Sequence, residues 1–403
     1  MSHEVGLEPL KPCNGCGACS AICKRDAIII TENYDGSLTK VVDYSKCNNC
    51  QACNSVCYKF IEATEYPTLD DKTCYAVCST NRATHSTTTS GGFGYELARW
   101  GVEHGYKIMG VEYDLATNSA RSTVASTLEE IEKFKGSKYL QSYTEQAFKE
   151  IRDIATQNPE QRFICFGTPC QIFGLRMLIN RLKLSNEILY VDLFCHGVPS
   201  YLVWRPYIAS QEQRLGTLRN VNFRYKGNGW HHYSILIEGE RKRYCNYAYN
   251  DIFYRYFFDN VALNRSCFDC EFRKGHSAAD IRIGDFLGRA YESREDGISA
   301  VIPLSAEGKS AIDELRAAGS IDIVGIHSAK EALGAQSTEE YDNIELRNSV
   351  IRRLEHEDIE SVQRWYFKQF PLKRRIYARL KSLATLLPVP LISGLRRCVR
   401  LKR

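Results

Sequence analysis

The chain has 403 residues, of which 44% are hydrophobic and 25% are charged, and its formal net charge is +5. This composition is ordinary for a globular protein of two or three domains, and no segment reaches the length of a membrane span. The positive charge comes from residues 371–403, which hold ten Lys and Arg but no Asp or Glu. The remainder has 43 basic and 48 acidic residues, which argues against nucleic-acid binding by the core.

Seventeen cysteines stand in a chain whose first twelve residues are polar and contain no apolar signal-peptide core. Small secreted domains use many cysteines as disulfides, whereas chains kept in the reducing cytosol use them mainly as metal ligands. The sequence therefore predicts a cytoplasmic protein that holds metal centres.

Two runs of cysteines near the N-terminus share the spacing C-x2-C-x2-C-x3-C, which is typical of a two-cluster ferredoxin. In that arrangement three thiolates of each run bind one [4Fe–4S] cluster, and the fourth thiolate reaches across to the other cluster. The predicted ligands of the first cluster are Cys13, Cys16, Cys19 and Cys57. The predicted ligands of the second are Cys47, Cys50, Cys53 and Cys23.

Small residues such as Gly15, Gly17 and Ala52 fit tight loops that aim three thiolates inward, and glycine allows left-handed turns. The alternatives are a zinc site, which needs four ligands rather than eight, and disulfides, which need an oxidising compartment. The runs depart from the usual bacterial pattern in one respect. Lys24 and Tyr58 follow the last cysteine of each run, where proline is usual.

Residues 1–62 are therefore expected to form a ferredoxin-like domain, with a strand over 27–31, a turn and a second strand over 39–42. After a linker, residues 73–78 alternate as a strand is expected to do. Cys74 and Cys78 would face the same way, and we interpret them as buried strand residues rather than cluster ligands.

A Ser/Gly loop that contains Ser90, Gly91 and Gly92 precedes a predicted helix that begins near residue 95. Such a loop can bind an anion through backbone N–H groups, or it can simply cap the helix. A strand over 107–113 and an acidic helix over 128–134 follow. The next loop contains Ser137 and Lys138, and it either holds a phosphate or is solvated.

The strands predicted over 162–166 and 187–194 are each followed by a loop and a helix, which indicates an α/β domain with a largely parallel sheet. Functional loops gather at the carboxyl ends of such strands, where Cys170 and Cys195 stand. Cys267-x2-Cys270 is a ligand pair that lacks its other half. These four cysteines would complete a third [4Fe–4S] site, the alternative being free thiols.

From Cys13 to about Val301 the chain resembles the coenzyme F420 hydrogenase/dehydrogenase β-subunit family, in the form with an N-terminal two-cluster ferredoxin domain. Six motifs carry the resemblance: Ser90-Gly91-Gly92, Gly136-Ser137-Lys138-Tyr139, Gly167-Thr168-Pro169-Cys170-Gln171, Cys195-His196-Gly197-Val198-Pro199-Ser200, Cys267-x2-Cys270 and Ala279-Asp280-Ile281-x-Ile283-Gly284-Asp285. Chlorophyll-pathway reductases and proteins from polysaccharide-biosynthesis gene sets look similar.

The resemblance implies an iron–sulfur flavoprotein that passes electrons from ferredoxin-type clusters through the third cluster to FAD, and then to an organic substrate or F420. It implies FAD contacts at Ser90, Gly91, Gly92, Ser137, Lys138 and Thr168. No G-x-G-x-x-G loop supports the flavin independently. His196 is a candidate proton donor or a structural histidine. The expected partner is reduced ferredoxin or a redox subunit, and an electron-transfer subunit without its own substrate is the alternative.

The expected fold class is α+β, with the ferredoxin-like domain followed by an α/β domain with a mixed sheet and a basic helical tail. The expected divisions are 1–62, 63–150, 151–330 and 331–403. Residues 374–387 form an amphipathic pattern that proline ends, and residues 396–403 are basic again. Residues 374–403 could therefore lie on an anionic membrane surface at the inner face of the membrane, or dock on the body.

Overall fold

The computed structural model describes residues 12–61, 66, 68–69, 71–232, 234–333 and 341–376. The chain divides into two compact units. The first unit comprises Met1–Tyr201 and Leu263–Asp342, and the second comprises Leu202–Ala262 and Asn343–Arg403. The four predicted divisions follow motifs rather than packing, and they stay predictions.

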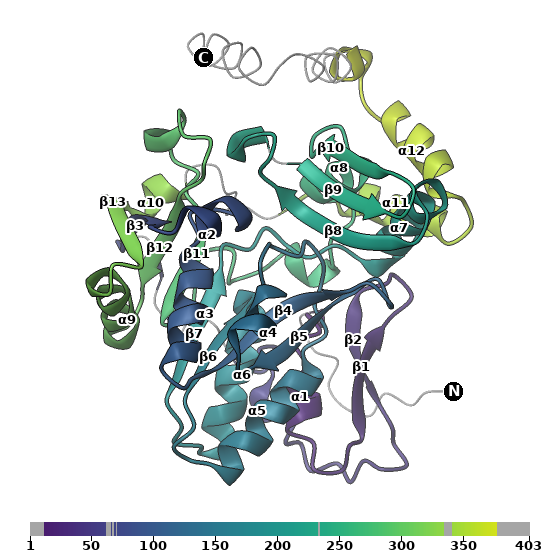
Figure 1. Cartoon of the computed structure of the whole chain (residues 1–403). Coiled ribbons are helices and arrows are strands. Elements are labelled where there is room, and N and C mark those ends of the chain that lie inside the picture. The colour runs from purple at the N-terminus through teal and green to yellow at the C-terminus, as the bar shows by residue number, and fades with distance from the viewer. Residues whose placement is uncertain are drawn as a thin grey trace. The chain divides into compact units, whose positions relative to one another are not determined.

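The first unit contains an eight-stranded sheet in the order β13-β3-β12-β11-β7-β6-β4-β5 (Figure 1). Its strands are β3 (Thr73–Ser79), β4 (Lys107–Asp114), β5 (Ser119–Ala125), β6 (Phe163–Gly167), β7 (Ile188–Leu193), β11 (Ile281–Asp285), β12 (Ser299–Pro303) and β13 (Ile321–Ser328). The mixed sheet is confirmed, but the expectation of a largely parallel one was too broad. Only β11, β7, β6 and β4 run parallel to their neighbours in that series. The other pairings are antiparallel. For β4 and β5 the reason is local, because residues 115–118 are too few to cross over to a parallel strand.

Helices cover both faces of this sheet. One face packs against α1 (Ala18–Ala21), α5 (Glu145–Gln157) and α6 (Pro169–Leu182). The other packs against α3 (Phe93–Glu103), α4 (Leu128–Glu132) and α9 (Ala306–Ala317). The alternation of β6 divides its side chains between the two layers, because Phe163 and Cys165 enter one core and Ile164 enters the other. The short helices α2 (Arg82–Thr87) and α10 (Ala329–Ala332) complete the described α-helices of this unit, which also has 3-10 turns at Asn54–Val56, Arg265–Cys267 and Arg289–Tyr291.

The predicted hairpin between the cysteine runs is confirmed as β1 (Ile28–Glu32) and β2 (Leu38–Val42), which pair antiparallel. One face of the hairpin packs on the first unit, where the Ile30 N–H donates to the Glu145 carboxylate at 2.9 Å. Helix α1, which follows the first cysteines, shares a core with α5 and α6. The N-terminal cysteine segment is therefore part of the first unit's packing.

The second unit is built on aromatic packing. Its elements are α7 (Tyr201–Leu215), β8 (Leu218–Tyr225), β9 (Ser234–Gly239), β10 (Arg243–Tyr247), α8 (Ile252–Phe258), α11 (Ile344–Leu354) and α12 (Ile359–Lys368). The three strands form an antiparallel sheet in the order β10-β9-β8. The Trp204 ring lies 4.9 Å from the Phe223 ring and 4.8 Å from the Phe253 ring, which joins helix α7 to the sheet and to α8.

The helical character predicted for the C-terminal region is confirmed for α11 and α12. The amphipathic pattern over 374–387 lies outside the described residues, except for 374–376. Among the helices of the described part, none combines the length and the apolar character that a membrane crossing requires.

A buried ion pair joins two central strands at the level where the functional loops begin. Asp192 on β7 and Arg282 on β11 are direct partners in the parallel register. The guanidinium donates two hydrogen bonds to the carboxylate, at 2.7 and 2.6 Å, and both side chains are nearly inaccessible to solvent. Arg282 also donates to the carbonyls of Phe272 and His276, so it fixes the loop that precedes β11.

Replacing Arg282 with Met should destabilise the first unit by about 3–5 kcal/mol, because Asp192 would remain buried without its charge partner. The measurement is the urea midpoint of anaerobically purified protein. Arg294→Met is the matched control, since its pair with Asp296 is half-exposed and should contribute less than about 1 kcal/mol. Equal midpoint shifts for the two variants would contradict the structural role of the buried pair.

Candidate metal centre

The first cysteine loop is held against the sheet domain. Gly15 and Gly17 have φ of +63° and +82°, as the predicted left-handed turns require. A Cβ atom at Gly15 would lie 2.6 Å from the Leu38 carbonyl oxygen, so the loop has no space for a side chain there. Gln141 donates to the Asn14 carbonyl at 2.8 Å, which anchors the loop.

The second cysteine loop repeats this backbone without the close packing. Asn49 and Gln51 have φ of +56° and +61°, at the positions that correspond to Gly15 and Gly17. In both loops a backbone N–H donates to the first thiol at 3.4 Å, from Gly15 to Cys13 and from Asn49 to Cys47. Cys47 and Cys50 are exposed, whereas the cysteines of the first run are partly buried. The internal repeat therefore extends from sequence to backbone geometry.

The thiols of the two runs lie near one another in the predicted groups. Burial raises the pKa of Cys19, and the nearby thiols of Cys13 and Cys57 raise it further. Burial also raises the pKa of Cys53, to which the thiols of Cys47 and Cys50 add. Cys57 is therefore a neighbour of the first run, although Cys53 of the second predicted group also raises the pKa of Cys19. The assignment of the eight cysteines to two clusters stays a prediction.

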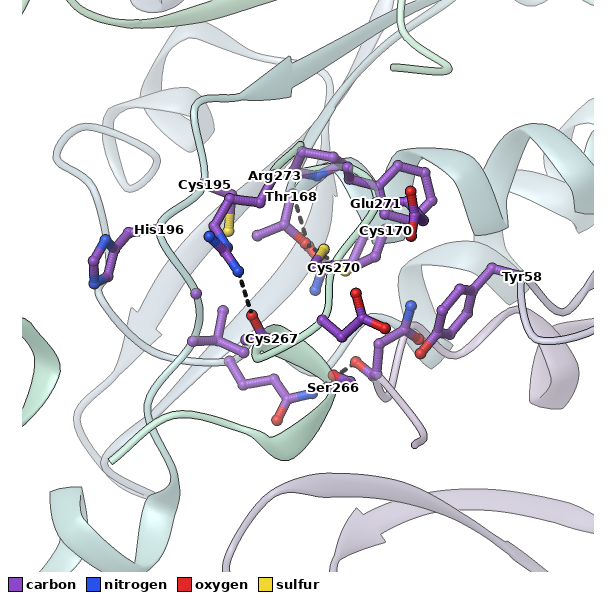
Figure 2. Close-up of a pocket in the computed structure, with 18 residues that line it drawn as sticks. Tyr58, Thr168, Cys170, Cys195, His196, Ser266, Cys267, Cys270, Glu271 and Arg273 are labelled. Atoms are coloured by element: carbon purple, nitrogen blue, oxygen red, sulfur yellow. Dashed lines mark hydrogen bonds between the residues drawn. The ribbon is translucent and has the colours of Figure 1, made fainter. Parts of the chain in front are cut away.

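Four further cysteines from three separate segments line one cavity of the first unit, which measures about 760 Å³ with its opening to solvent included (Figure 2). They are the predicted third set: Cys170, Cys195, Cys267 and Cys270. Cys170 follows β6, and Cys195 follows β7, the neighbouring parallel strand. The two loops meet because the carboxyl ends of adjacent parallel strands lie at one edge of the sheet.

Cys170 lies in the first turn of α6, where backbone N–H groups and the helix dipole favour a thiolate. Thr168 caps this helix together with Gln171, and the Thr168 hydroxyl lies 3.3 Å from the Cys170 sulfur. Burial raises the pKa of Cys170 to about 12, and the thiol of Cys270 adds to the shift. Without a cation these thiols would stay protonated, and iron would bind them as thiolates.

The loop after Cys195 is shaped to approach Cys267. Gly197 has φ of +143°, and a Cβ atom there would lie 2.8 Å from the Leu263 side chain and 3.3 Å from Cys267. Burial raises the pKa of Cys267 to about 12, while the backbone N–H of Val198 donates to its sulfur and lowers it. Hydrogen bonds from backbone N–H groups to sulfur are a usual feature of iron–sulfur sites.

Tyr58 links this cavity to the first cysteine run. Its side chain lines the cavity, and it directly follows Cys57 in the chain. Burial raises the pKa of Tyr58, and the thiols of Cys170 and Cys13 raise it further, so the phenol lies between the two groups. A Cβ atom at Gly174 on α6 would lie only 2.9 Å from the Cys16 sulfur. The first cysteine run and the cavity cysteines therefore both lie against helix α6.

The donor set of the cavity fits a [4Fe–4S] cluster. The buried Asn14 amide nitrogen, which belongs to a residue lining the cavity, has no hydrogen-bond partner among the described residues, and it can donate to sulfur. In the described part of the chain, no three His, Cys, Asp or Glu side chains converge as ligands of one metal ion. Cubane ligands differ in this respect, because each thiolate binds a different iron.

His196 lines the same cavity but faces away from the thiols. Figure 2 shows its ring directed away from the four cysteines. Its Nδ1 atom lies 3.2 Å from the Tyr341 hydroxyl, which also donates to the His196 carbonyl at 2.8 Å. The contacts are those of a histidine held in place by hydrogen bonding, and the catalytic role of His196 stays a prediction.

The loops predicted to contact FAD are partly brought together. The Ser137 N–H donates to the Thr89 hydroxyl at 2.9 Å, which joins the 136–138 loop to the Ser90 loop. Ser90 donates to the Ile298 carbonyl, and Gly91 lies where a Cβ atom would be 2.1 Å from the Val77 carbonyl. Gly92 is the N-cap of α3 with φ of +93°. Thr168, in contrast, belongs to the cysteine cavity.

Lys138 has an unusual environment for a lysine on a loop. Its ammonium group donates to the carbonyls of Lys133 and Lys135, at 2.8 and 2.9 Å, near the end of α4. Burial lowers the pKa of Lys138 to about 7, although Glu112 opposes the shift. The group can therefore change its charge near neutral pH, which an exposed lysine cannot do.

Three residues that position the site were not selected from the sequence. Arg282 occupies the variable position of a motif, and its partner Asp192 lies within β7. The signal for this pair in the sequence is that one apolar strand contains a single acidic residue and another a single basic residue. Such charges are buried in strands only when they are paired. For Tyr58 the only signal in the sequence is that it stands where proline is usual.

Cys74 and Cys78 are buried in strand β3, as expected for packing residues, and Cys165 is buried in strand β6. Cys165 packs in the core with α5 and α6, away from the loops that end the strands. These cysteines therefore stand apart from the thiols that line the cavity.

Comparison with known proteins gives one family and a distant structural likeness. Residues 160–329 match the family described as the C terminus of the beta subunit of coenzyme F420 hydrogenase/dehydrogenase. A chain of the F420-reducing [NiFe] hydrogenase complex from Methanosarcina barkeri is similar, with 17% identity, a TM-score of 0.46, and 72% of this chain and 92% of that chain covered. No curated protein matches. Residues 160–329 are thus similar to the C-terminal part of the beta subunit of coenzyme F420 hydrogenase/dehydrogenase.

Proposed function

We propose that the protein is an iron–sulfur flavoprotein oxidoreductase. The eight cysteines of the two N-terminal runs hold two [4Fe–4S] clusters, and the four cysteines of the cavity hold a third. FAD completes the set of cofactors. When bound, clusters exchange single electrons, and a flavin exchanges either one or two. Two electrons from a one-electron donor, together with two protons, would thus reduce one molecule of an organic acceptor.

One observation carries this proposal: four cysteines from three segments meet in a cavity that Tyr58 and Asn14 of the N-terminal segment also line. An electron-transfer protein with only two clusters would not need the four cavity cysteines. The chain supplies cysteine sulfurs as ligands, backbone N–H groups from Val198 and Gly197 near them, and walls that limit solvent access. Burial and hydrogen bonding of this kind tune cluster potentials.

The flavin is supported by the family match over residues 160–329 and by the joined loops at Thr89 and Ser137. FAD would lie at the predicted contacts, with Lys138 supplying positive charge. F420 is a second candidate for the acceptor, favoured by the family description that residues 160–329 match. An electron-transfer subunit of a larger complex is the non-enzymatic alternative. The enzyme is supported if the anaerobically purified protein binds FAD and, without any partner subunit, reduces F420 or another small acceptor.

Replacing Cys267 with Ala should remove about four of about twelve iron atoms, because one of three clusters would lose a ligand. Iron, acid-labile sulfide and flavin are measured together on anaerobically purified protein. Cys165→Ala is the matched control, since Cys165 is buried in the core on strand β6. It should keep the full iron content.

If Cys267→Ala retains all its iron while the wild type holds about twelve atoms, the third site is wrong. If the wild type holds about eight atoms and no FAD, the electron-transfer subunit replaces the enzyme. Colourless wild-type protein that contains neither iron nor sulfide would remove the whole proposal.

Lys138 should make FAD binding depend on pH. In the flavin-free protein the Lys138 amine has a pKa of about 7. Above that pH, Lys138 must therefore take up a proton when FAD binds, so that it can pair with the diphosphate. The affinity of deflavinated protein for FAD should therefore fall as pH rises from about 6 to about 8.5. Lys138→Met should bind FAD more weakly at low pH and lose this dependence. Fluorescence titration with FAD measures both.

Lys135→Met provides the control, because Lys135 lies near the same loop but its ammonium group pairs with Glu132. This variant should keep the pH profile of the wild type. An unchanged affinity and an unchanged profile in Lys138→Met would place the flavin elsewhere.

A further inference from the structure

The second cysteine loop is the part of the iron–sulfur segment that faces solvent. Every residue from Asp43 to Gln51 is exposed, including Cys47 and Cys50. The first loop is instead held by Gln141 and Thr144, and its Cys16 thiol approaches α6. The two loops share one backbone geometry, so the difference lies in what covers them. A redox centre at the second loop would be the one accessible to an external donor.

An exposed apolar patch lies on the hairpin that leads to this loop. Ile29 and Val41 are direct cross-strand partners, and they are 54% and 45% exposed. Tyr44, between β2 and Cys47, is 57% exposed. The opposite face of the hairpin is buried, with Ile28 and Ile30 in the protein. Apolar side chains that gather at an exposed face of this kind commonly mark a protein interface.

Basic side chains surround the same loop. We call Lys24, Arg25 and Lys46 the basic rim; all three are exposed. The Arg25 guanidinium donates to the Lys46 carbonyl at 3.4 Å, which joins the segment after Cys23 to the second loop. Asp43 and Asp26 are the acidic residues beside the rim. Asp43 pairs with Lys46 of the rim, and Asp26 pairs with Lys149 of α5. With Lys149 included, four cations stand against these two anions, so the net charge of the group is positive.

We propose that the second cysteine loop, the Ile29–Val41–Tyr44 patch and the basic rim form the docking face for an acidic protein that carries single electrons, of the ferredoxin type. This inference rests on the proposed function, because it assigns the donor to one of its clusters. Each encounter oxidises the carrier by one electron and reduces the chain by one electron, without proton transfer. An apolar centre with a charged rim suits a transient protein complex, and opposite charge speeds its formation.

The layout also gives the direction of the internal path. With clusters bound, the exposed second loop would be the point of electron entry, and the first loop, whose Cys16 sulfur lies against α6, would be the neighbour of the cavity thiols. Tyr58 and Gly174 bring the first loop against the third group. A donor that approached the cavity directly would bypass both N-terminal groups, and charge reversal at the rim would then have no effect.

The test uses the triple variant Lys24→Glu, Arg25→Glu, Lys46→Glu in anaerobic full-length protein. Stopped-flow absorbance follows cluster reduction by a reduced acidic bacterial ferredoxin at low ionic strength. The second-order rate constant should fall about tenfold or more, and its dependence on salt should weaken. Reduction by the methyl viologen radical, a small cation, should not slow. Iron content must equal that of the wild type.

A matched charge reversal serves as the control: Arg82→Glu, Arg316→Glu, Lys330→Glu, all exposed and all outside the cysteine segment. It changes net charge equally, so it should leave the ferredoxin rate near that of the wild type. If the rim variant loses iron, the variant Lys24→Glu, Lys46→Glu keeps the Arg25 hydrogen bond and repeats the measurement.

Equal rates for the rim variant and the control would overturn the docking face. If ferredoxin fails to reduce the wild type while methyl viologen succeeds, the inference about the partner fails and the proposed function stands. If neither reduces an iron-loaded wild type, the proposed function itself fails.

Discussion

The paired charges of Arg282 and Asp192 are the constraint on which the cavity depends. They lie opposite each other on two parallel strands, one of which leads to Cys195. The same guanidinium binds two carbonyls of the loop that carries Cys267 and Cys270, so one side chain positions two of the three cysteine segments. Because both charges are buried, neither is tolerated without the other. The third segment, at Cys170, is placed by the adjacent strand and by the cap of α6.

The two cysteine loops show how packing selects residue type. Both need positive φ at the same two positions, and glycine is obligatory only where neighbouring atoms leave no space. Asn49 and Gln51 adopt the same backbone in the exposed loop, since nothing there excludes a side chain. The composition of a loop therefore indicates whether it lies against the body or faces solvent. The asparagine and the glutamine at these positions therefore indicate an exposed loop and not a loss of the cysteine motif.

The sequence could predict the elements whose periodicity is strong and the ligands whose spacing is regular. Strands β3, β4, β6 and β7 were found because they are apolar runs bounded by turns, and Cys170 and Cys195 were joined by the rule for parallel strand ends. The outer antiparallel strands could not be assigned to their neighbours, because pairing between distant segments has no local signal. Arg282 was hidden in a variable position, and Tyr58 gave only a missing proline. The unit formed by residues 202–262 and 343–403 joins two separated stretches that no motif connects.

Tyr58 shows why a departure from a motif repays physical examination. Proline at that position would only close a loop, whereas tyrosine adds a ring that reaches the cavity and lies 6.3 Å from the Phe272 ring. Phe272 in turn packs 5.4 Å from Phe173 on α6, so aromatic side chains fill the space between the first loop and the cavity thiols. Such packing excludes water and holds the two groups of thiols at a fixed separation. An electron passing between them would cross a rigid, apolar contact, and the medium would reorganise little as the charge moved.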